Sequence, residues 1–209
     1  MTGQKRVMPE RGLWLLVLLL LVAVALVIFW QDSSEESAGH RDLPLIAAPQ
    51  GGDFGLSREG ESFALSDYRG QVVLLYFGYT FCPDVCPTSL ALMTNALRRM
   101  TPEQLAQVQG VFVSVDPERD TPAQLAEYTG FFHPNIHGVS GTEAQLAEAG
   151  ALYGAAWQRA ESDSAMGYAV DHSSNTYVID KDGQLVEILA HGASVERILE
   201  VVLPLLDEE

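Results

Sequence analysis

Two strand-like segments with an amphipathic segment between them constrain the fold of this chain most. Val72 to Phe77 and Val111 to Val115 are rich in strand-forming residues and almost entirely apolar, as is typical of strands buried on both faces of a sheet. The segment between them, Thr88 to Met100, places apolar residues on one face of a helix, namely Leu90, Met93 and Leu97. The sequence therefore predicts a strand–helix–strand unit of an α/β fold.

Threonine caps predict three further helices. Thr101, Thr121 and Thr142 each have a glutamine three residues later, the spacing at which the two side chains cap a helix reciprocally. Pro102 and Pro122 would then occupy the first helical position, where a missing N–H costs nothing. We therefore expect helices to begin at these three points.

Two β-hairpins and a last helix complete the predicted domain. Lys181, Asp182 and Gly183 form a turn signal between strands at Thr176–Ile179 and Leu185–Leu189. A smaller hairpin is expected at Phe54 to Leu65, and a helix at Val195 to Leu206. The order β-α-β-α followed by a hairpin and a helix predicts a thioredoxin-like α/β fold, with a central mixed sheet flanked by helices.

An unbroken apolar segment precedes this domain. Every residue from Leu13 to Trp30 is apolar, and as a helix this segment would span roughly 27 Å, close to the hydrocarbon thickness of a bilayer. Basic residues precede it and acidic residues follow it, so the positive-inside rule places residues 1–12 in the cytoplasm. We therefore predict one transmembrane anchor at 13–30, a polar tether at 31–50 and the thioredoxin-like domain at 51–209.

The alternative to an anchor is a cleaved signal peptide. Ser37 to Gly39 offers a cleavage site, but it lies far from the apolar segment, which is longer than a usual signal-peptide core. The anchor is the better interpretation. The simplest placement is a bacterial inner membrane, crossed once, with the C-terminal domain in the periplasm.

The charge of the chain limits its partners. The formal net charge is −16 at pH 7, which argues against nucleic acid and anionic lipid, because both are bound through clustered Lys and Arg. A basic protein partner is compatible with this charge. A solvated acidic surface that keeps the domain soluble needs no partner and is the simpler explanation of the charge.

The only two cysteines of the chain lie in one loop, within the stretch YTFCPDVCPTSL. Cys82 follows the strand that ends at Phe77, and Cys86 directly precedes the predicted helix, so the pair lies at the carboxyl end of the sheet, where open α/β folds keep their sites. Each cysteine precedes a proline, which disfavours helical backbone. We therefore expect Cys86 to cap the helix, where the helix N-terminus would favour its thiolate.

Three interpretations of this pair compete. A disulfide staple is compatible with an oxidising compartment, but closing so short a loop contributes only about 2 kcal/mol. A dithiol redox enzyme of the thioredoxin type usually has C-x-x-C and a cis-proline, whereas this chain has C-x-x-x-C and no proline between Pro134 and Pro204. The third interpretation is a metal site, because two thiolates together with one imidazole are suitable ligands for copper.

Copper would need a histidine as its third ligand, and the chain has five. One of them, His172, stands just before the strand at Thr176, where a thioredoxin-like fold brings a loop against the cysteine loop. His172 is therefore the geometric candidate. The others fall in the tether, in a loop or near strand ends, where a solvated or structural histidine is expected: His40, His133, His137 and His191.

Three motifs together resemble one protein family. FGYTFCPDVCPTSL, VSVDPERDTP and VDHSSNTYVID, in this order behind one N-terminal apolar segment, are similar to the Sco family, also called SenC, the copper proteins of cytochrome c oxidase assembly. The resemblance implies a thioredoxin-like fold and one copper ion, Cu(I) or Cu(II), held by Cys82, Cys86 and His172. It also implies delivery of that copper to the binuclear CuA centre of oxidase subunit II.

Two functions remain open on this resemblance. As a copper chaperone, the protein would hold the ion in an exposed site and exchange it with subunit II after loading by a periplasmic copper donor. As a thiol-disulfide oxidoreductase, it would use Cys82 and Cys86 to reduce the CuA-site cysteines, with a periplasmic thiol reductant as its partner.

Three aspartates near the motifs have two interpretations each. Asp84 lies between the cysteines, Asp116 enters an Asp-Pro turn, and Asp120 precedes a capped helix. Turn formation and capping are the simpler roles for all three. Orientation or electrostatic tuning of the metal ligands is the alternative.

Overall fold

The computed structural model describes residues 14, 18–26, 42–161 and 167–207. The chain divides into two units, Met1–Gly39 and His40–Glu209. Residues 18–26 are helical, but the predicted anchor at 13–30 lies partly outside the described residues. No helix in the described ranges is long and apolar enough to cross a membrane, so the anchor stays a prediction.

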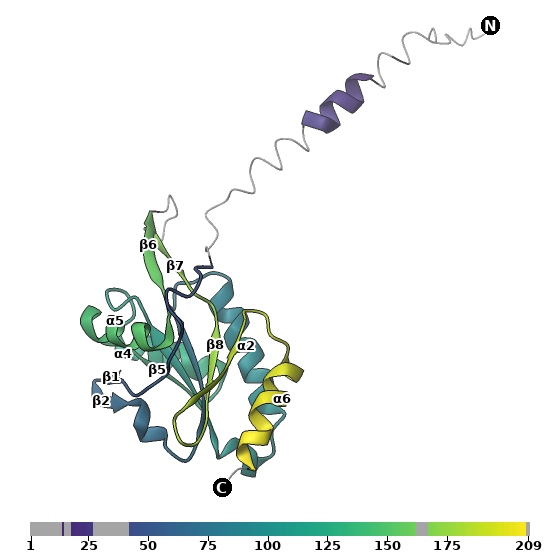
Figure 1. Ribbon diagram of the computed structural model, residues 1–209. Coiled ribbons are helices and arrows are strands. Elements are labelled where there is room, and N and C mark those ends of the chain that lie inside the picture. Colours follow the sequence, from purple (N-terminus) through teal and green to yellow (C-terminus); the bar gives the residue numbers. More distant parts are fainter. Residues whose placement is uncertain (1–13, 15–17, 27–41, 162–166, 208–209) are drawn as a thin grey trace, which may run out of the picture. The chain divides into compact units, whose positions relative to one another are not determined.

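A five-stranded mixed sheet forms the centre of the second unit (Figure 1). Its order is β5 (Ile136–Val139), β4 (Val108–Ser114), β3 (Val72–Gly78), β8 (Thr176–Ile179) and β9 (Leu185–Leu189). Strands β3, β4 and β5 are parallel, whereas β8 and β9 each run antiparallel to their neighbour. All seven residues of β3 are buried, as predicted for a central strand covered on both faces. The α/β fold with a mixed sheet is confirmed.

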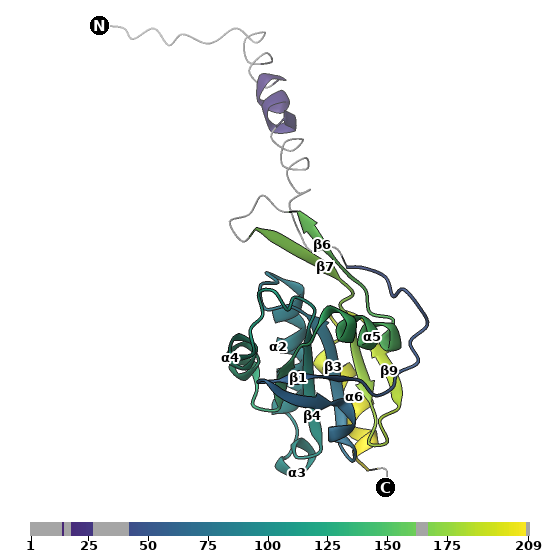
Figure 2. The same ribbon diagram turned by 90° about the vertical axis from the view of Figure 1, so that its left-hand side faces the viewer.

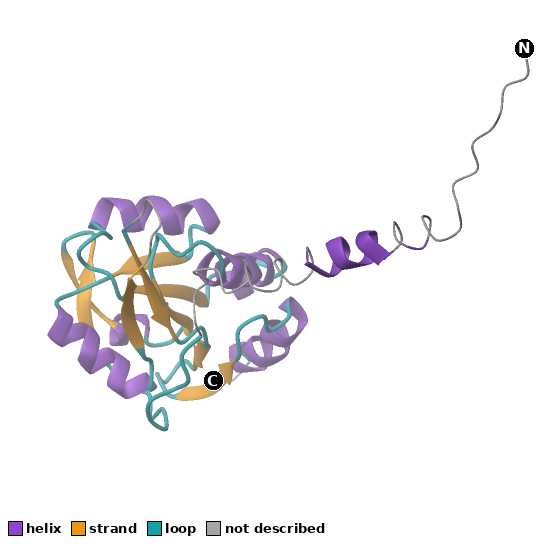
Figure 3. Cartoon of the chain, turned by 90° about the horizontal axis from the view of Figure 1, so that it is seen from above, coloured by secondary structure: helices purple, strands orange, loops and turns teal. Residues whose placement is uncertain are grey.

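Helices flank both faces of this sheet (Figure 3). Tyr76 and Phe77 are neighbours on β3, so their side chains point to opposite faces. On one face, Phe112 stacks on Tyr76 and contacts Tyr128 of α4, while on the other, Phe77 contacts Tyr153 of α5. The helices are α2 (Val85–Arg98), α3 (Pro102–Leu105), α4 (Pro122–Phe132), α5 (Glu143–Tyr153) and α6 (Val195–Leu206), with a 3-10 turn, η1, at Leu65–Tyr68.

The predicted threonine caps are confirmed. Thr101, Thr121 and Thr142 each accept a hydrogen bond from the backbone N–H three residues later, and Pro102 and Pro122 lie in the first turn of their helices. The local sequence therefore fixes where α3, α4 and α5 begin.

Two hairpins lie outside the central sheet. The predicted one is formed by β1 (Gly55–Arg58) and β2 (Glu61–Ala64). The second, β6 (Trp157–Glu161) with β7 (Tyr168–His172), was not predicted and extends beyond the rest of the domain (Figure 2). Its β6 strand has no buried residue, so it lacks the apolar alternation that marks a strand in a sequence.

Residues 42–50, the end of the predicted tether, lie along the domain. Leu43 N–H donates to the His172 carbonyl at 3.2 Å, and Gln50 N–H donates to the Leu152 carbonyl at 2.9 Å. Asp42 also pairs with His172 as an isolated parallel bridge. The segment that leads into the domain is thereby fixed to the strand that ends at His172.

Candidate metal centre

The cysteine loop connects β3 to α2 at the carboxyl end of the parallel strands. Helix α2 begins at Val85 with Asp84 as its cap residue, so Cys86 is the second helical residue. The prediction that Cys86 caps the helix and is not helical is wrong. Pro87 fits in the first turn because the N–H groups there have no partner within the helix, and the restriction on the residue before proline is only a preference.

The fold brings Cys82, Cys86 and His172 together. Their sulfur and nitrogen atoms all lie within 4.8 Å of one another, and Cys86 Sγ is 3.3 Å from His172 Nε2. His172 is the last residue of β7 rather than part of a loop. Both cysteines are free in this structure, without a disulfide. The three residues proposed from the sequence thus form one cluster.

The backbone around His172 fixes which ring nitrogen faces the cysteines. His172 Nδ1 lies 3.0 Å from the Ser173 carbonyl oxygen. A carbonyl only accepts, so Nδ1 carries the hydrogen and Nε2 directs its lone pair toward Cys86. The rings of Tyr76 and Tyr79 meet the imidazole edge to face, at centroid distances of 6.1 and 5.8 Å. The ring is therefore held as a metal-binding histidine is held, with one nitrogen bonded to the protein.

The cluster is closed to solvent. Cys86 and His172 are 0% exposed and Cys82 is 5% exposed. The expectation of an exposed site is therefore wrong for this conformation. The two tyrosines and the apolar residues of α2 and β3 cover the ligands, so a metal ion or a partner reaches them only when part of this cover moves.

The two thiols differ in their electrostatics. The pKa of Cys82 is lowered to about 3, chiefly by a hydrogen bond from Cys86, and further by the neighbouring His172 side chain and by hydrogen bonds from the backbone N–H groups of Asp84 and Cys86. Burial and the adjacent Cys82 raise the pKa of Cys86. The thiolate was predicted at Cys86, and this prediction is wrong. The backbone N–H groups of the cap residue Asp84 and of Cys86 in the first turn of α2 bond to the sulfur of Cys82, which lies three residues before the helix.

This asymmetry predicts the order in which the thiols react. In the reduced, metal-free protein we expect iodoacetamide to modify Cys82 well before Cys86. The rate at Cys82 should change little between pH 5 and 8, because its pKa lies below this range. Peptide mass spectrometry of timed samples measures both rates. A rate at Cys82 that rises with pH toward 8.5, as for an ordinary thiol, would contradict the assignment.

Gly78 leaves the space that Cys86 occupies. A Cβ atom on Gly78 would lie 2.6 Å from Cys86 Sγ and 3.0 Å from both the Tyr76 and Phe112 rings. Any larger residue at this point would push the sulfur aside. The sequence analysis did not single out Gly78, although a glycine at the end of a buried strand signals a close approach of another group.

None of the three aspartates belongs to the Cys–Cys–His cluster. Asp84 is exposed, and its carbonyl, not its carboxylate, bonds to Thr88. The carboxylate of Asp120 is buried and accepts from the Thr80 N–H at 2.9 Å, the Thr80 hydroxyl at 2.6 Å and the Ser114 hydroxyl at 2.6 Å. Asp120 therefore ties the end of β4 to the residue two positions before Cys82.

Removal of this tie is expected to destabilise the domain. Asp120→Ala leaves the donors of Thr80 and Ser114 without their acceptor in the interior, which we expect to cost about 3 kcal/mol of unfolding free energy. Denaturant titration followed by circular dichroism measures it. Glu127→Ala, at an exposed position of α4, is the control and should stay within about 0.5 kcal/mol of the parent. Equal stability of the two variants would exclude the tie.

The other described histidines have partners elsewhere. His133 Nδ1 accepts from the Asn135 N–H, His137 Nε2 lies 3.0 Å from Gln109 Oε1, and His191 Nδ1 lies 3.1 Å from Ser89 Oγ. His40 lies outside the described residues. Within the part of the chain that the structure describes, Cys82, Cys86 and His172 form the one group of three side chains suited to a metal ion.

The sequence pattern of a known family covers nearly all of this domain. The SCO1/SenC family pattern matches residues 45–207. The chain belongs to the SCO1/SenC family. Among its SCO1/SenC relatives is the mitochondrial SCO2 homolog of Mus musculus, 39% identical over 158 residues, which are 75% of this chain and 62% of that relative. The chain thus spans less than two thirds of the length of this relative.

Solved SCO1/SenC structures share the fold. The solution structure of apo Sco1 from Thermus thermophilus has a TM-score of 0.69 and 35% identity, covering 81% of this chain and 100% of that one. Bradyrhizobium japonicum ScoI, solved with copper bound, has a TM-score of 0.66 and 35% identity, covering 75% and 97%. The thioredoxin-like fold, predicted from the order of strands and helices, is confirmed. The family, predicted from the three motifs, is confirmed as well.

The donor set fits a soft metal ion. Two thiol sulfurs and one imidazole nitrogen provide three ligands of the types that copper prefers. They are too few for the four-ligand sites of structural zinc. The cluster can also act as a dithiol, since its two sulfurs are close enough together to be metal ligands of one ion.

Proposed function

We propose that this protein is a copper chaperone that binds one copper ion through Cys82, Cys86 and His172. It delivers this ion to, or prepares, the CuA centre of cytochrome c oxidase subunit II. The observation that carries the proposal is the convergence of the three side chains within 4.8 Å. Bradyrhizobium japonicum ScoI, of the same family and fold, has been solved with copper bound.

The chemistry of the donors specifies the ion. Thiolates favour Cu(I), and the imidazole makes Cu(II) acceptable as well. Metal binding requires both thiols to lose their protons. Oxidation of Cys82 and Cys86 to a disulfide would give two electrons to a thiol oxidant and remove both thiolate ligands. Copper loading therefore depends on the redox state of the pair.

The proposed location follows from the N-terminal sequence. The apolar segment 13–30, with basic residues before it and acidic residues after it, supports a single-pass anchor in a bacterial inner membrane with the domain in the periplasm. There the partners would be oxidase subunit II, a periplasmic copper donor or thiol reductant, and the membrane itself. The net charge of −16 speaks against nucleic acid.

A second candidate function is thiol-disulfide exchange with the CuA-site cysteines. The lowered pKa of Cys82 favours it, because the thiolate is the species that attacks a disulfide. In this function Cys82 would attack first and Cys86 would resolve the mixed disulfide. The imidazole of His172 would have no essential part.

The variant His172→Ala separates the two functions. We expect an equal mixture of the Cu(I)-loaded and Cu(II)-loaded full chain to form the mixed-valence CuA absorption bands on mixing with the reduced, copper-free CuA domain of subunit II, and His172→Ala to lose this ability. Reduction of the oxidised CuA domain by the metal-free dithiol should survive in the variant. If His172→Ala transfers copper as the parent does, the chaperone assignment of His172 falls. If only dithiol exchange is detectable in both proteins, the oxidoreductase function stands.

A further inference from the structure

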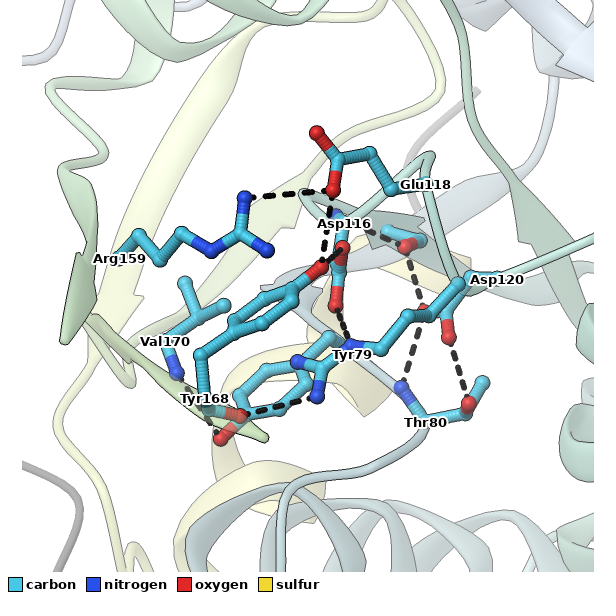
Figure 4. A network of polar contacts seen from close by, with 10 residues as sticks. Tyr79, Thr80, Asp116, Glu118, Asp120, Arg159, Tyr168 and Val170 are labelled. Atoms are coloured by element: carbon cyan, nitrogen blue, oxygen red, sulfur yellow. Dashed lines mark hydrogen bonds and ion pairs between the residues drawn. The ribbon is translucent and has the colours of Figure 1, made fainter. Parts of the chain in front are cut away.

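The ring of Tyr168 on β7 lies between two guanidinium groups. Arg119 Cζ is 3.6 Å and Arg159 Cζ is 3.4 Å from the ring centroid. Two groups so close to one centroid overlap unless they lie on opposite faces, so the ring is enclosed from both sides. The Tyr168 hydroxyl donates to Asp116 Oδ1 at 2.7 Å (Figure 4). We call these four residues the Tyr168 clamp.

The clamp joins the hairpin to the loop that supports the cysteines. Arg119 bonds to Asp116 Oδ2 through Nε at 2.5 Å and to the Tyr168 carbonyl through Nη1 at 2.9 Å. Asp120, one residue further along the same loop, holds Thr80 (Figure 4). A continuous set of polar contacts therefore runs from β7 through residues 116–120 to the start of the cysteine loop.

Tyr168 lies on the same face of β7 as His172, because side chains four residues apart in a strand point the same way. Val170, between them, donates its N–H to the Tyr79 hydroxyl at 3.3 Å. Among the described strands, β6 and β7 pair with each other and not with the central sheet. Side-chain contacts on this face, the stacking of Trp157 of β6 on Phe77 of β3 and the bridge to Asp42 therefore decide together how closely His172 approaches the cysteines.

We propose that Tyr168 is a positioning residue for copper: its clamp holds β7 against the cysteine loop and so keeps His172 within bonding distance of an ion on Cys82 and Cys86. This inference rests on the proposed copper function. Because all three ligands are buried, copper exchange requires part of the structure around them to move, and in this proposal the part that moves is β7. The clamp stands four residues from His172 with the exposed Arg159 on one side of the ring, so its release is the step that opens the site.

The test compares copper release from variants of the full chain. We expect Tyr168→Ala to release Cu(I) to a chromogenic chelator about tenfold faster than the parent, the lower end of the effect of groups that orient a metal ligand. Arg159→Ala, which removes one face of the clamp at a half-exposed side chain, should give a smaller increase. Tyr168→Phe keeps both stacking faces and loses only the hydroxyl. Its rate of Cu(I) release should therefore lie between the rate of the parent and the rates of the two alanine variants. Arg197→Ala, which breaks exposed ion pairs elsewhere, is the control.

A double-mutant cycle separates positioning from general destabilisation. In the His172→Ala background, Tyr168→Ala should not accelerate release further, because the ligand that it positions is absent. In the metal-free parent, hydrogen exchange of the amides at the end of β7 should be slow, and Tyr168→Ala should accelerate it.

The outcomes distinguish this inference from the function on which it rests. Faster release in Tyr168→Ala and Arg159→Ala that disappears in the His172→Ala background supports the clamp. Release at the parent rate in both variants, or an equal acceleration without His172, overturns it while the copper function stands. A parent protein that binds no copper overturns the proposed function itself.

Discussion

Cys86→Ser is expected to weaken Cu(I) binding by more than about 100-fold. Groups that only orient a metal ligand already contribute 10- to 100-fold to affinity, and Cys86 supplies a sulfur atom 3.3 Å from the third ligand. A hydroxyl is a hard donor that does not replace a thiolate on a soft ion. Competition against a Cu(I) chelator of known affinity measures the loss.

Thr94→Val is the matched control for this substitution. Thr94 is also buried on α2, and its hydroxyl has no hydrogen-bond partner among the residues that the structure describes, so an isosteric apolar residue should leave stability and copper affinity unchanged. If Cys86→Ser binds Cu(I) within about threefold of the parent, Cys86 is not a ligand.

Gly78→Ala is expected to damage the site and the core together. The added Cβ would lie 2.6 Å from Cys86 Sγ and would also press on two buried rings. Overpacking of this kind costs about 1–3 kcal/mol of unfolding free energy, and here the displaced atom is a metal ligand. We therefore expect lower stability by denaturant titration and weaker Cu(I) binding by competition.

Gly130→Ala is the control for this substitution, because the same added methyl group should raise the stability of the domain there. Gly130 is exposed on α4, and a Cβ there would meet no atom of the described residues within 4 Å other than its chain neighbours and the backbone of its own helix. The substitution should stabilise the domain by up to about 1 kcal/mol, because alanine favours a helix over glycine. A Gly78→Ala protein with the stability and copper affinity of the parent would show that Cys86 does not depend on this close approach.

Local signals made much of the fold predictable from the sequence. The apolar composition of β3, the threonine caps of α3, α4 and α5 and the turn at Gly183 each depend on residues close together in the chain. His172 was selected by its expected position in the fold, and the structure places it beside Cys86. The buried strand, the threonine caps and the turn could be predicted without knowledge of distant contacts.

Long-range contacts account for what the sequence did not reveal. The β6–β7 hairpin is held by the Tyr168 clamp, by the stacking of Trp157 on Phe77 and by the bridge to Asp42, and these contacts leave no periodic apolar pattern. The helical backbone of Cys86 and the thiolate at Cys82 depend on how the first turn of α2 meets the loop. The burial of the site depends on Tyr76 and Tyr79, which contact His172 although they lie far from it in the sequence.

Copper titration of the purified full chain, with and without prior thiol reduction, tests the central claim most directly. We predict that the reduced chain binds one Cu(I) per molecule, that its Cu(II) form shows thiolate-to-copper charge-transfer absorption, and that the oxidised chain binds neither tightly, because a disulfide removes both thiolates. A reduced chain that binds no copper, or an oxidised chain that binds it equally well, would contradict a site built from Cys82, Cys86 and His172.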